Sequence, residues 1–117
     1  MMEFLPQNLS NLAWALANLA VVNLPLMNSI AAAAIRTISA FLPQNISNLS
    51  WACAKLDFSH GHLMQAIASE AHARSSEFQV QDMCNTVWSF ATLGFLNAPL
   101  MHASSAQALR TMSQFDS

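Results

Sequence analysis

Apolar residues recur along the chain at three- and four-residue steps, which is the spacing of one face of an α-helix. The first such stretch follows Pro6 and stops at a polar break near Asn23 to Pro25, and a second stretch continues to residue 38. The pattern predicts two amphipathic helices joined by a short turn. Their apolar faces are Leu9, Leu12, Ala13, Leu16 and Ala20 in the first, and Leu26, Met27, Ile30, Ala31, Ala34, Ile35 and Ile38 in the second.

The whole pattern returns with a period of 37 residues, which Phe4, Phe41, Phe78 and Phe115 mark. Three full units span 4–40, 41–77 and 78–114, and residues 115–117 begin a fourth. One helical hairpin cannot bury both of its apolar faces, so neighbouring units complete each other's core. We therefore predict an all-α fold, in which residues 1–117 form a single α-solenoid of three 37-residue helix-turn-helix repeats.

Signals for the first turn of a helix recur in the same register. Pro6 and Pro43 suit the first helical turn, where the missing N–H has no partner in any case. Two residues later an oxygen-bearing side chain can accept a hydrogen bond from a free backbone N–H. The side chains at this position are Asn8, Asn45 and Asp82. In the middle unit, His60 to His62 fill the turn between the two helices.

Charge is scarce in this sequence. Only 9% of the residues are charged and 54% are apolar, whereas a typical domain has about 25% charged residues. Such a surface suits a chain that a partner covers, or one piece of a longer array. Residues 4–35 carry no charge, but Asn18, Asn23, Pro25 and Asn28 interrupt the stretch, so we predict no membrane insertion.

No pattern in the sequence is typical of an enzyme. There is no pairing of a nucleophile with a base, no glycine-rich phosphate loop and no suggestive pair of carboxylates. His60, His62 and His72 have no cysteine or carboxylate at ligand spacing, so we predict neither a metal site nor a cofactor. Cys53 and Cys84 cannot form a disulfide framework, and both are expected to be small buried thiols.

The motif PQN[LI]SNL[AS]WA, at residues 6–15 and again at 43–52, resembles the helical repeats of organellar RNA-binding proteins. These are the heptatricopeptide and octotricopeptide repeat families, which are related to the arrays beside FAST-kinase-like and RAP domains. The third copy departs from the motif at Val80, Thr86 and Ser89. The resemblance implies a right-handed α-solenoid in mitochondria or plastids that binds single-stranded RNA or rRNA for stabilisation, processing or translation.

Modular RNA recognition requires side chains that recur by position but differ in identity. On the polar side of the first helix of each unit this description fits Asn18, Lys55 and Thr92, our main candidates for contacts with base edges. The alternative for such variable residues is a solvated surface. A second variable set lies on the other helix, at Asn28, Gln65 and His102, and ranks lower.

Other polar positions on the first helix do not vary among the units. Their constancy predicts a structural role in which they hydrogen-bond between units, and the residues are Gln7, Gln44, Gln81, Asn11, Asn48 and Asn85. Trp14, Trp51 and Trp88 lie at the edge of the same polar stripe. We expect these indoles to pack between adjacent units, although an indole at such an edge can also stack on a base.

The chain has four Lys and Arg residues and a formal net charge of −2, which does not favour a nucleic-acid partner. Arg36 and Arg110 occupy the same place in their units, and Arg74 is displaced by one residue. Together they are candidates for a stripe that follows an RNA backbone. The alternative is a favourable interaction of each arginine with the C-terminal end of its helix.

Two classes of function follow from the sequence. One is a non-catalytic RNA-associated module. The other is a structural or scaffold subunit that acts through protein–protein contacts in a larger organellar complex, which the low charge and apolar ends favour. Both are compatible with a ribonucleoprotein such as an organellar ribosome. A third possibility is a fragment of a longer array, because a fourth unit begins at Phe115.

Overall fold

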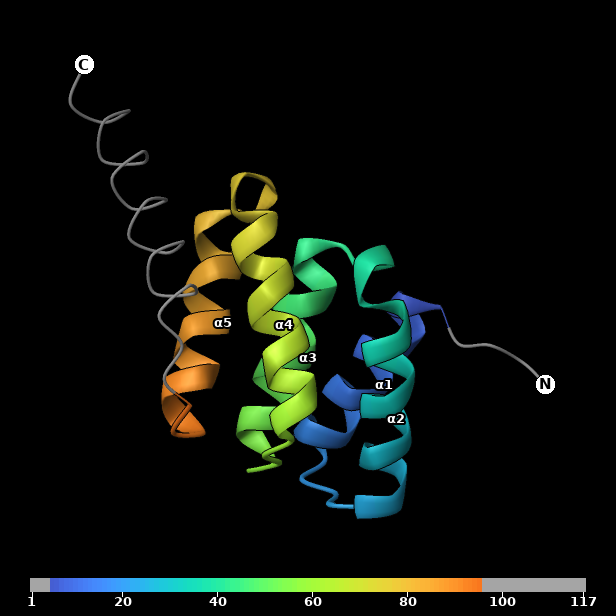
Figure 1. The fold of residues 1–117 in the computed structure, drawn as a ribbon. Coiled ribbons are helices and arrows are strands. Elements are labelled where there is room, and N and C mark those ends of the chain that lie inside the picture. The colour runs from blue at the N-terminus through green and yellow to red at the C-terminus, as the bar shows by residue number, and fades with distance from the viewer. Residues whose placement is uncertain (1–4, 96–117) are drawn as a thin grey trace.

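The structure is a computed structural model that describes residues 5–95, and this part of the chain is all-helical (Figure 1). It contains no strand, as the sequence predicts. The second helix predicted for residues 78–114, His102, Arg110 and the start of a fourth unit lie outside the described residues. The elements are α1 (Pro6–Asn18), α2 (Leu24–Thr37), α3 (Pro43–Lys55), α4 (Gly61–Ala73) and α5 (Val80–Thr92), with short 3-10 helices at Ile38–Ala40 and Ser75–Glu77.

The starts of the helices follow the predicted local signals. The Oδ1 atom of Asn8 accepts a hydrogen bond from the backbone N–H of Leu5 at 3.1 Å. Asn45 does the same for Leu42 at 3.0 Å, and Asp82 Oδ2 for Gln79 at 3.3 Å. Because these bonds tie down the residue before each helix, α1, α3 and α5 begin at positions 6, 43 and 80, which are 37 residues apart.

The ends of the same three helices also share one geometry. Ala20, Asp57 and Gly94 have positive φ angles of 53°, 53° and 80°. In each case the N–H of the next residue reaches back to the helix, as in the 2.9 Å bond from Val21 N to Leu16 O, the pattern of a Schellman cap. Ala20 was therefore wrongly assigned to the apolar face of the first helix, since it lies exposed in the turn beyond it.

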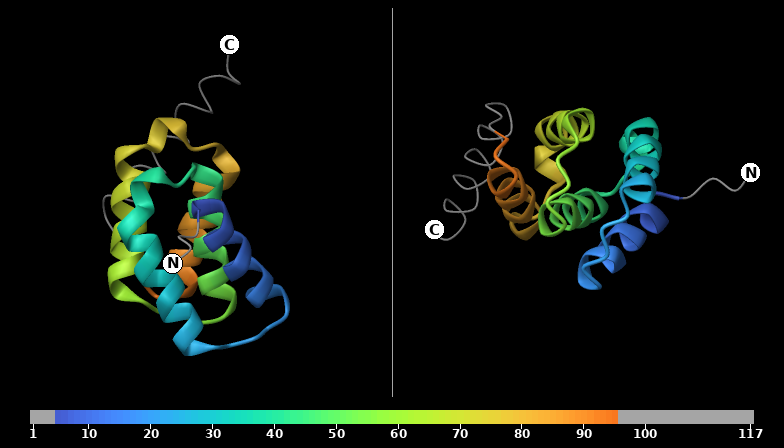
Figure 2. Two further views of the ribbon diagram at one scale, coloured as in Figure 1. Left: turned by 90° about the vertical axis from the view of Figure 1, so that its right-hand side faces the viewer. Right: turned by 90° about the horizontal axis from the view of Figure 1, so that it is seen from below.

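The helices form two layers. Seen from below in Figure 2, α1, α3 and α5 stand side by side in one row and α2 and α4 in a second. Helix α3 contacts both α1 and α5, and α2 contacts α4. Each helix of the second row also packs on the helix that precedes it, so the chain alternates between the two rows.

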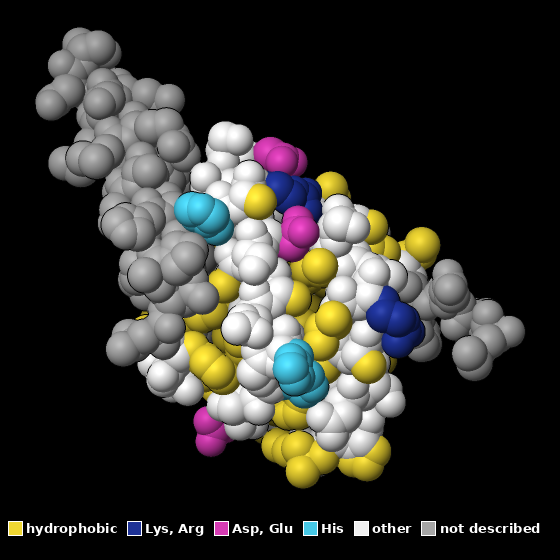
Figure 3. Space-filling model, in the orientation of Figure 1, with side chains coloured by type: hydrophobic (Ala, Val, Ile, Leu, Met, Phe, Trp, Pro, Cys, Tyr) yellow, Lys and Arg dark blue, Asp and Glu magenta, His cyan; other side chains and the backbone are white. Residues whose placement is uncertain are grey.

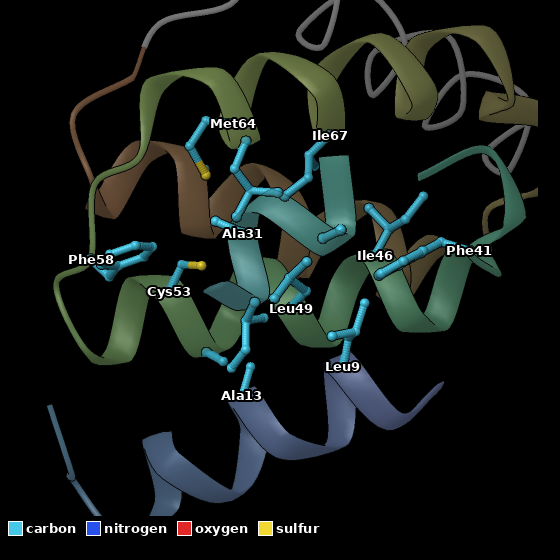
Figure 4. Packing of buried hydrophobic residues seen from close by; sticks show 14 of the residues in the cluster. Leu9, Ala13, Ala31, Phe41, Ile46, Leu49, Cys53, Phe58, Met64 and Ile67 are labelled. Carbon is cyan, nitrogen blue, oxygen red and sulfur yellow. The ribbon is translucent and has the colours of Figure 1, made fainter. Parts of the chain in front are cut away.

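The core lies between the two rows and is continuous from α1 to α5. Figure 4 shows Leu9 and Ala13 of α1 pointing toward α3, whose Leu49 and Cys53 lie among side chains from both rows. Burying a side chain of the size of Leu contributes about 1.5–3 kcal/mol, so these contacts hold the rows together. No described helix has both the length and the apolar character needed to cross a membrane.

Candidate functional site

Helices α1, α3 and α5 each display the same row of side chains on the side opposite the core. Positions spaced by four, three and four residues fall within a narrow arc of a helix at 100° per residue. In each of these three helices the row consists of glutamine, asparagine, tryptophan and then a residue whose identity differs from helix to helix. We call these rows the outer stripes: Gln7, Asn11, Trp14 and Asn18 on α1; Gln44, Asn48, Trp51 and Lys55 on α3; Gln81, Asn85, Trp88 and Thr92 on α5.

The amide groups of the outer stripes are open to solvent. The three glutamines and Asn11 are exposed, and Asn48 and Asn85 are half-buried. Within residues 5–95 no hydrogen bond of these six side chains is found, so the bonds predicted between units are absent there. The reason is geometric, because the stripe points away from the second row of helices and from the apolar positions that meet the neighbouring helix. Their donors and acceptors are therefore available to a ligand.

A polar hollow of about 410 Å³ lies where the stripes of α3 and α5 begin. Its lining includes Gln44 and Asn48 from one stripe and Gln81 and Asn85 from the next. Glu77 and Asp82 also line it, but no basic residue does. The hollow thus offers amide and carboxylate groups and suits a ligand with hydrogen-bond donors more than a phosphate. This hollow was not predicted from the sequence, although the repeated Gln–x3–Asn spacing marks its position.

The tryptophans are only partly covered. Trp14 and Trp88 keep 48% and 47% of their surface exposed, and Trp51 is half-buried. The Nζ atom of Lys55 lies 5.7 Å from the centre of the Trp51 ring, which is a cation–π distance. Packing between units stays a prediction for these indoles, and their exposed surface leaves room for a stacked ring.

The residues that vary among the units stand at the last position of each outer stripe, four residues after the tryptophan. Asn18, Lys55 and Thr92 are the last residues of α1, α3 and α5, and all three are exposed. Asn18 Nδ2 donates to the backbone oxygen of Trp14 at 2.9 Å, which leaves its Oδ1 as a possible acceptor contact. In the lower-ranked set, Asn28 and Gln65 are exposed on α2 and α4, in the other row of helices.

The arginines do not join the outer stripes. Arg74 follows α4, where its Nη1 donates to the backbone oxygen of Phe41 at 2.7 Å and its guanidinium pairs with Glu70 at 3.5 Å and Glu77 at 3.4 Å. Arg36 lies exposed on α2, and Arg110 is outside the described residues. The face in Figure 3 carries few charged side chains, and near its top acidic and basic groups adjoin. Among the described residues, Arg36 and Arg74 therefore do not form a continuous phosphate-tracking stripe, because Arg74 is occupied by a bond that links α4 to the start of α3.

The two cysteines have opposite surroundings. Cys53 is fully buried in α3, and burial raises the pKa of its thiol from 9.0 to about 12. Cys84 of α5 is exposed, so its predicted burial is wrong. The periodic pattern marks the side of α5 on which Cys84 lies as a contact surface, but no helix within residues 5–95 covers that thiol.

His60 has a structural task at the start of α4, where its Nδ1 accepts a hydrogen bond from Leu63 N at 3.1 Å. In the part of the chain that the structure describes, no three His, Cys, Asp or Glu side chains are grouped so that they could hold a metal ion. Comparison with known proteins finds no family model, no curated protein and no solved structure that matches the chain.

Proposed function

We propose that this chain is a non-catalytic helical-repeat module, an α-solenoid of 37-residue units, that associates with single-stranded RNA or rRNA through its outer stripes. The observation that carries the proposal is the presence of three parallel helices with the same open Gln–Asn–Trp row and a different residue at its end. The motif's resemblance to organellar RNA-binding repeats supports the same partner and a mitochondrial or plastid location.

The chemistry of the stripes fits unpaired bases. An amide side chain has both donors and acceptors and can bond to the edge of any base. A half-exposed indole can stack on a base, which contributes roughly 1–3 kcal/mol. A strand that crosses α1, α3 and α5 would meet two amides, one indole and one variable side chain on each helix.

Phosphate contacts contribute little in this proposal. Lys55 is the one basic residue of the outer stripes and lies at the last position of α3. The hollow at the start of α3 and α5 is lined by carboxylates and amides, with no cation among the described residues that line it. Because the salt dependence of binding scales as roughly −0.7 per neutralised phosphate on single strands, the expected log–log slope is about −0.7 to −1.4. Binding is expected to come mainly from the bases, and so to prefer unpaired RNA over a duplex.

The proposal is tested by fluorescence anisotropy of short labelled RNAs at about 50 mM and about 200 mM salt. Replacing Gln44 and Asn48 by Ala should weaken binding of single strands at least tenfold. The matched control replaces Asn28 and Gln65, which are exposed on the other row, and should leave binding unchanged. Equal weakening by both pairs, or no binding by the folded wild-type chain, would reject the outer stripes as the RNA site.

A scaffold role is the second candidate function, and the apolar surface at the α1 end of the described chain favours it. Leu5, Leu19, Val22 and Leu24 are all more than half exposed there. A folded chain that binds no RNA, but whose co-purifying protein partner is lost when Leu19 and Leu24 become Ser, would support this alternative.

A further inference from the structure

Helix α3 has two contact sides, and comparison with its equivalents shows which residues form each. Four positions are buried in α3, but their counterparts 37 residues earlier in α1 are exposed or half-buried. These positions face the preceding helix of the row. We call them the front face: Asn8, Leu12, Ala15 and Leu16 in α1; Asn45, Leu49, Ala52 and Cys53 in α3; Asp82, Thr86, Ser89 and Phe90 in α5.

The opposite side of α3 shows the reverse change. Three positions are buried in α1 and α3, but are exposed or half-buried 37 residues later in α5. They face the next helix of the row and form the back face: Ser10, Ala13 and Ala17 in α1; Ser47, Ser50 and Ala54 in α3; Cys84, Val87 and Ala91 in α5. The contacts α1–α3 and α3–α5 are thus the same contact made twice, the back of one helix on the front of the next.

The shape of the contact explains why it repeats. The back face carries mostly small side chains, which let the bulkier front-face residues such as Leu49 and Phe90 approach closely. Two buried hydroxyls at the contact between α3 and α5 are satisfied within their own helices: Ser50 Oγ donates to Ile46 O at 2.8 Å, and Thr86 Oγ1 donates to Asp82 O at 2.8 Å. These two hydroxyls therefore need no polar partner from the other helix.

Two of these faces have no helix of the described chain against them, namely the front of α1 and the back of α5. Neither of the two carries a charged residue, so covering them removes no ion from water. Beside the front of α1 a small apolar hollow of about 90 Å³ opens between α1 and α2, lined by Leu12, Leu26 and Ala33 among others. The front of α1 thus resembles the side of α3 that already accepts the back of another helix.

We propose that a second copy of this chain stacks head to tail on the first, with the front face of α1 against the back face of α5 of the other copy. The contact continues the one already present between α1, α3 and α5. Such an interface is heterologous, because the two copies use different surfaces, and it leaves one open face at each end of the stack. Further copies can therefore add as concentration rises. This inference does not depend on RNA binding.

The test is sedimentation equilibrium of the whole chain with one blocking substitution on each face. Ala15→Glu places a charge on the front of α1 and Ala91→Glu on the back of α5, and both residues are exposed in the single chain, so folding should persist. Ser69→Glu is the control, because this position is exposed in α4 and its counterpart Ala32 is exposed in α2. Circular dichroism verifies that each variant is helical.

The wild-type chain and the Ser69→Glu control should increase in mass with concentration beyond a dimer. Each blocked variant alone should remain a monomer. An equal mixture of the two should form a dimer and nothing larger, since one intact front and one intact back remain. A wild-type monomer at every concentration, or a mixture that fails to pair, would overturn the proposal. An independent readout is the rate of labelling of Cys84, which should fall on concentrating the wild-type chain and stay constant if no stacking occurs.

Discussion

Helices α1 and α3 are nearly the same peptide in two different surroundings. Residues 6–18 and 43–55 share eight of the ten letters of the PQN[LI]SNL[AS]WA motif, yet Ala52 is fully buried whereas its counterpart Ala15 is exposed. The difference arises because α3 lies between α1 and α5, whereas α1 has only one neighbour in the row among the described helices. The sequence of one unit therefore sets which face of a helix is ready for contact, and the neighbouring unit determines whether that face is covered.

The largest expected difference is between the reactivities of the two thiols, Cys53 in α3 and Cys84 in α5. The exposed Cys84 should react readily with a maleimide at pH 8, whereas Cys53 should react roughly a thousandfold more slowly. Only the thiolate attacks, and burial raises the pKa of the Cys53 thiol to about 12, so little thiolate forms in the folded chain below that pH. The measurement is mass spectrometry of the labelled peptides over time.

A matched variant sharpens this comparison. Ser47 is the counterpart of Cys84 and is buried against α5. In the chain with Cys84→Ser and Ser47→Cys, the thiol occupies the same place in its unit but should now be protected. Rapid labelling at position 47 would show that the back face of α3 is not covered as described.

The next effect is on stability. Leu49→Ala in α3 should lower the free energy of unfolding by about 3 kcal/mol, because it leaves a cavity between packed helices. Leu12→Ala, at the equivalent half-buried position of α1, should lower it by only about 1 kcal/mol. Urea unfolding followed by circular dichroism measures both. Equal losses would mean that α1 and α3 have the same surroundings.

Replacing either of the two described arginines should lower stability less than replacing Leu49 does, and the loss should be larger for Arg74 than for Arg36. Arg74→Ala removes the hydrogen bond to Phe41 O and two ion pairs, and should destabilise the chain by about 1–2 kcal/mol. Arg36→Ala on the exposed surface of α2 should change stability by less than about 0.5 kcal/mol. Thermal unfolding of the two variants side by side gives the comparison, and a larger loss for Arg36 would contradict it.

The smallest change in stability is expected for substitutions in the turns that follow α1 and α5. Ala20 and Gly94 occupy equivalent turns with positive φ, a conformation that glycine adopts without strain. Ala20→Gly should therefore stabilise the chain by up to about 1 kcal/mol, and Gly94→Ala should destabilise it by about 1 kcal/mol. Chemical unfolding of both variants checks the opposite signs, and a shift in the same direction for both would contradict the shared cap geometry.

Much of the fold could be predicted from the sequence, because its signals are local. Proline at the first helical turn and the oxygen-bearing residue two positions later predicted the starts of α1 and α3, and helical spacing identified Leu9, Met27 and Ile30 as core. The burial of Cys84 was predicted wrongly because it is not determined by local signals. Its position is a contact position in every unit, and whether it is covered depends on the next unit and not on the peptide itself.

The candidate site was only partly predictable. Spacing on one helix showed that Asn18, Lys55 and Thr92 follow the constant amides and tryptophans, since that relation is set within thirteen residues. The hollow between α3 and α5 and the bond from Arg74 to Phe41 join residues about thirty positions or more apart, as in the separation of 33 for Arg74 and Phe41. Such contacts depend on how the rows pack, which periodicity alone does not specify.

The central claim is that the outer stripes are the surface that meets RNA, and photo-crosslinking tests it most directly. Short single-stranded RNAs containing 4-thiouridine would be bound to the whole chain, irradiated and digested, and the modified peptides identified by mass spectrometry. We predict adducts on residues of the outer stripes, foremost at Trp14, Trp51 and Trp88, and no adducts on α2 or α4. Adducts confined to α2 and α4, or no adducts at all from a folded sample, would contradict the claim.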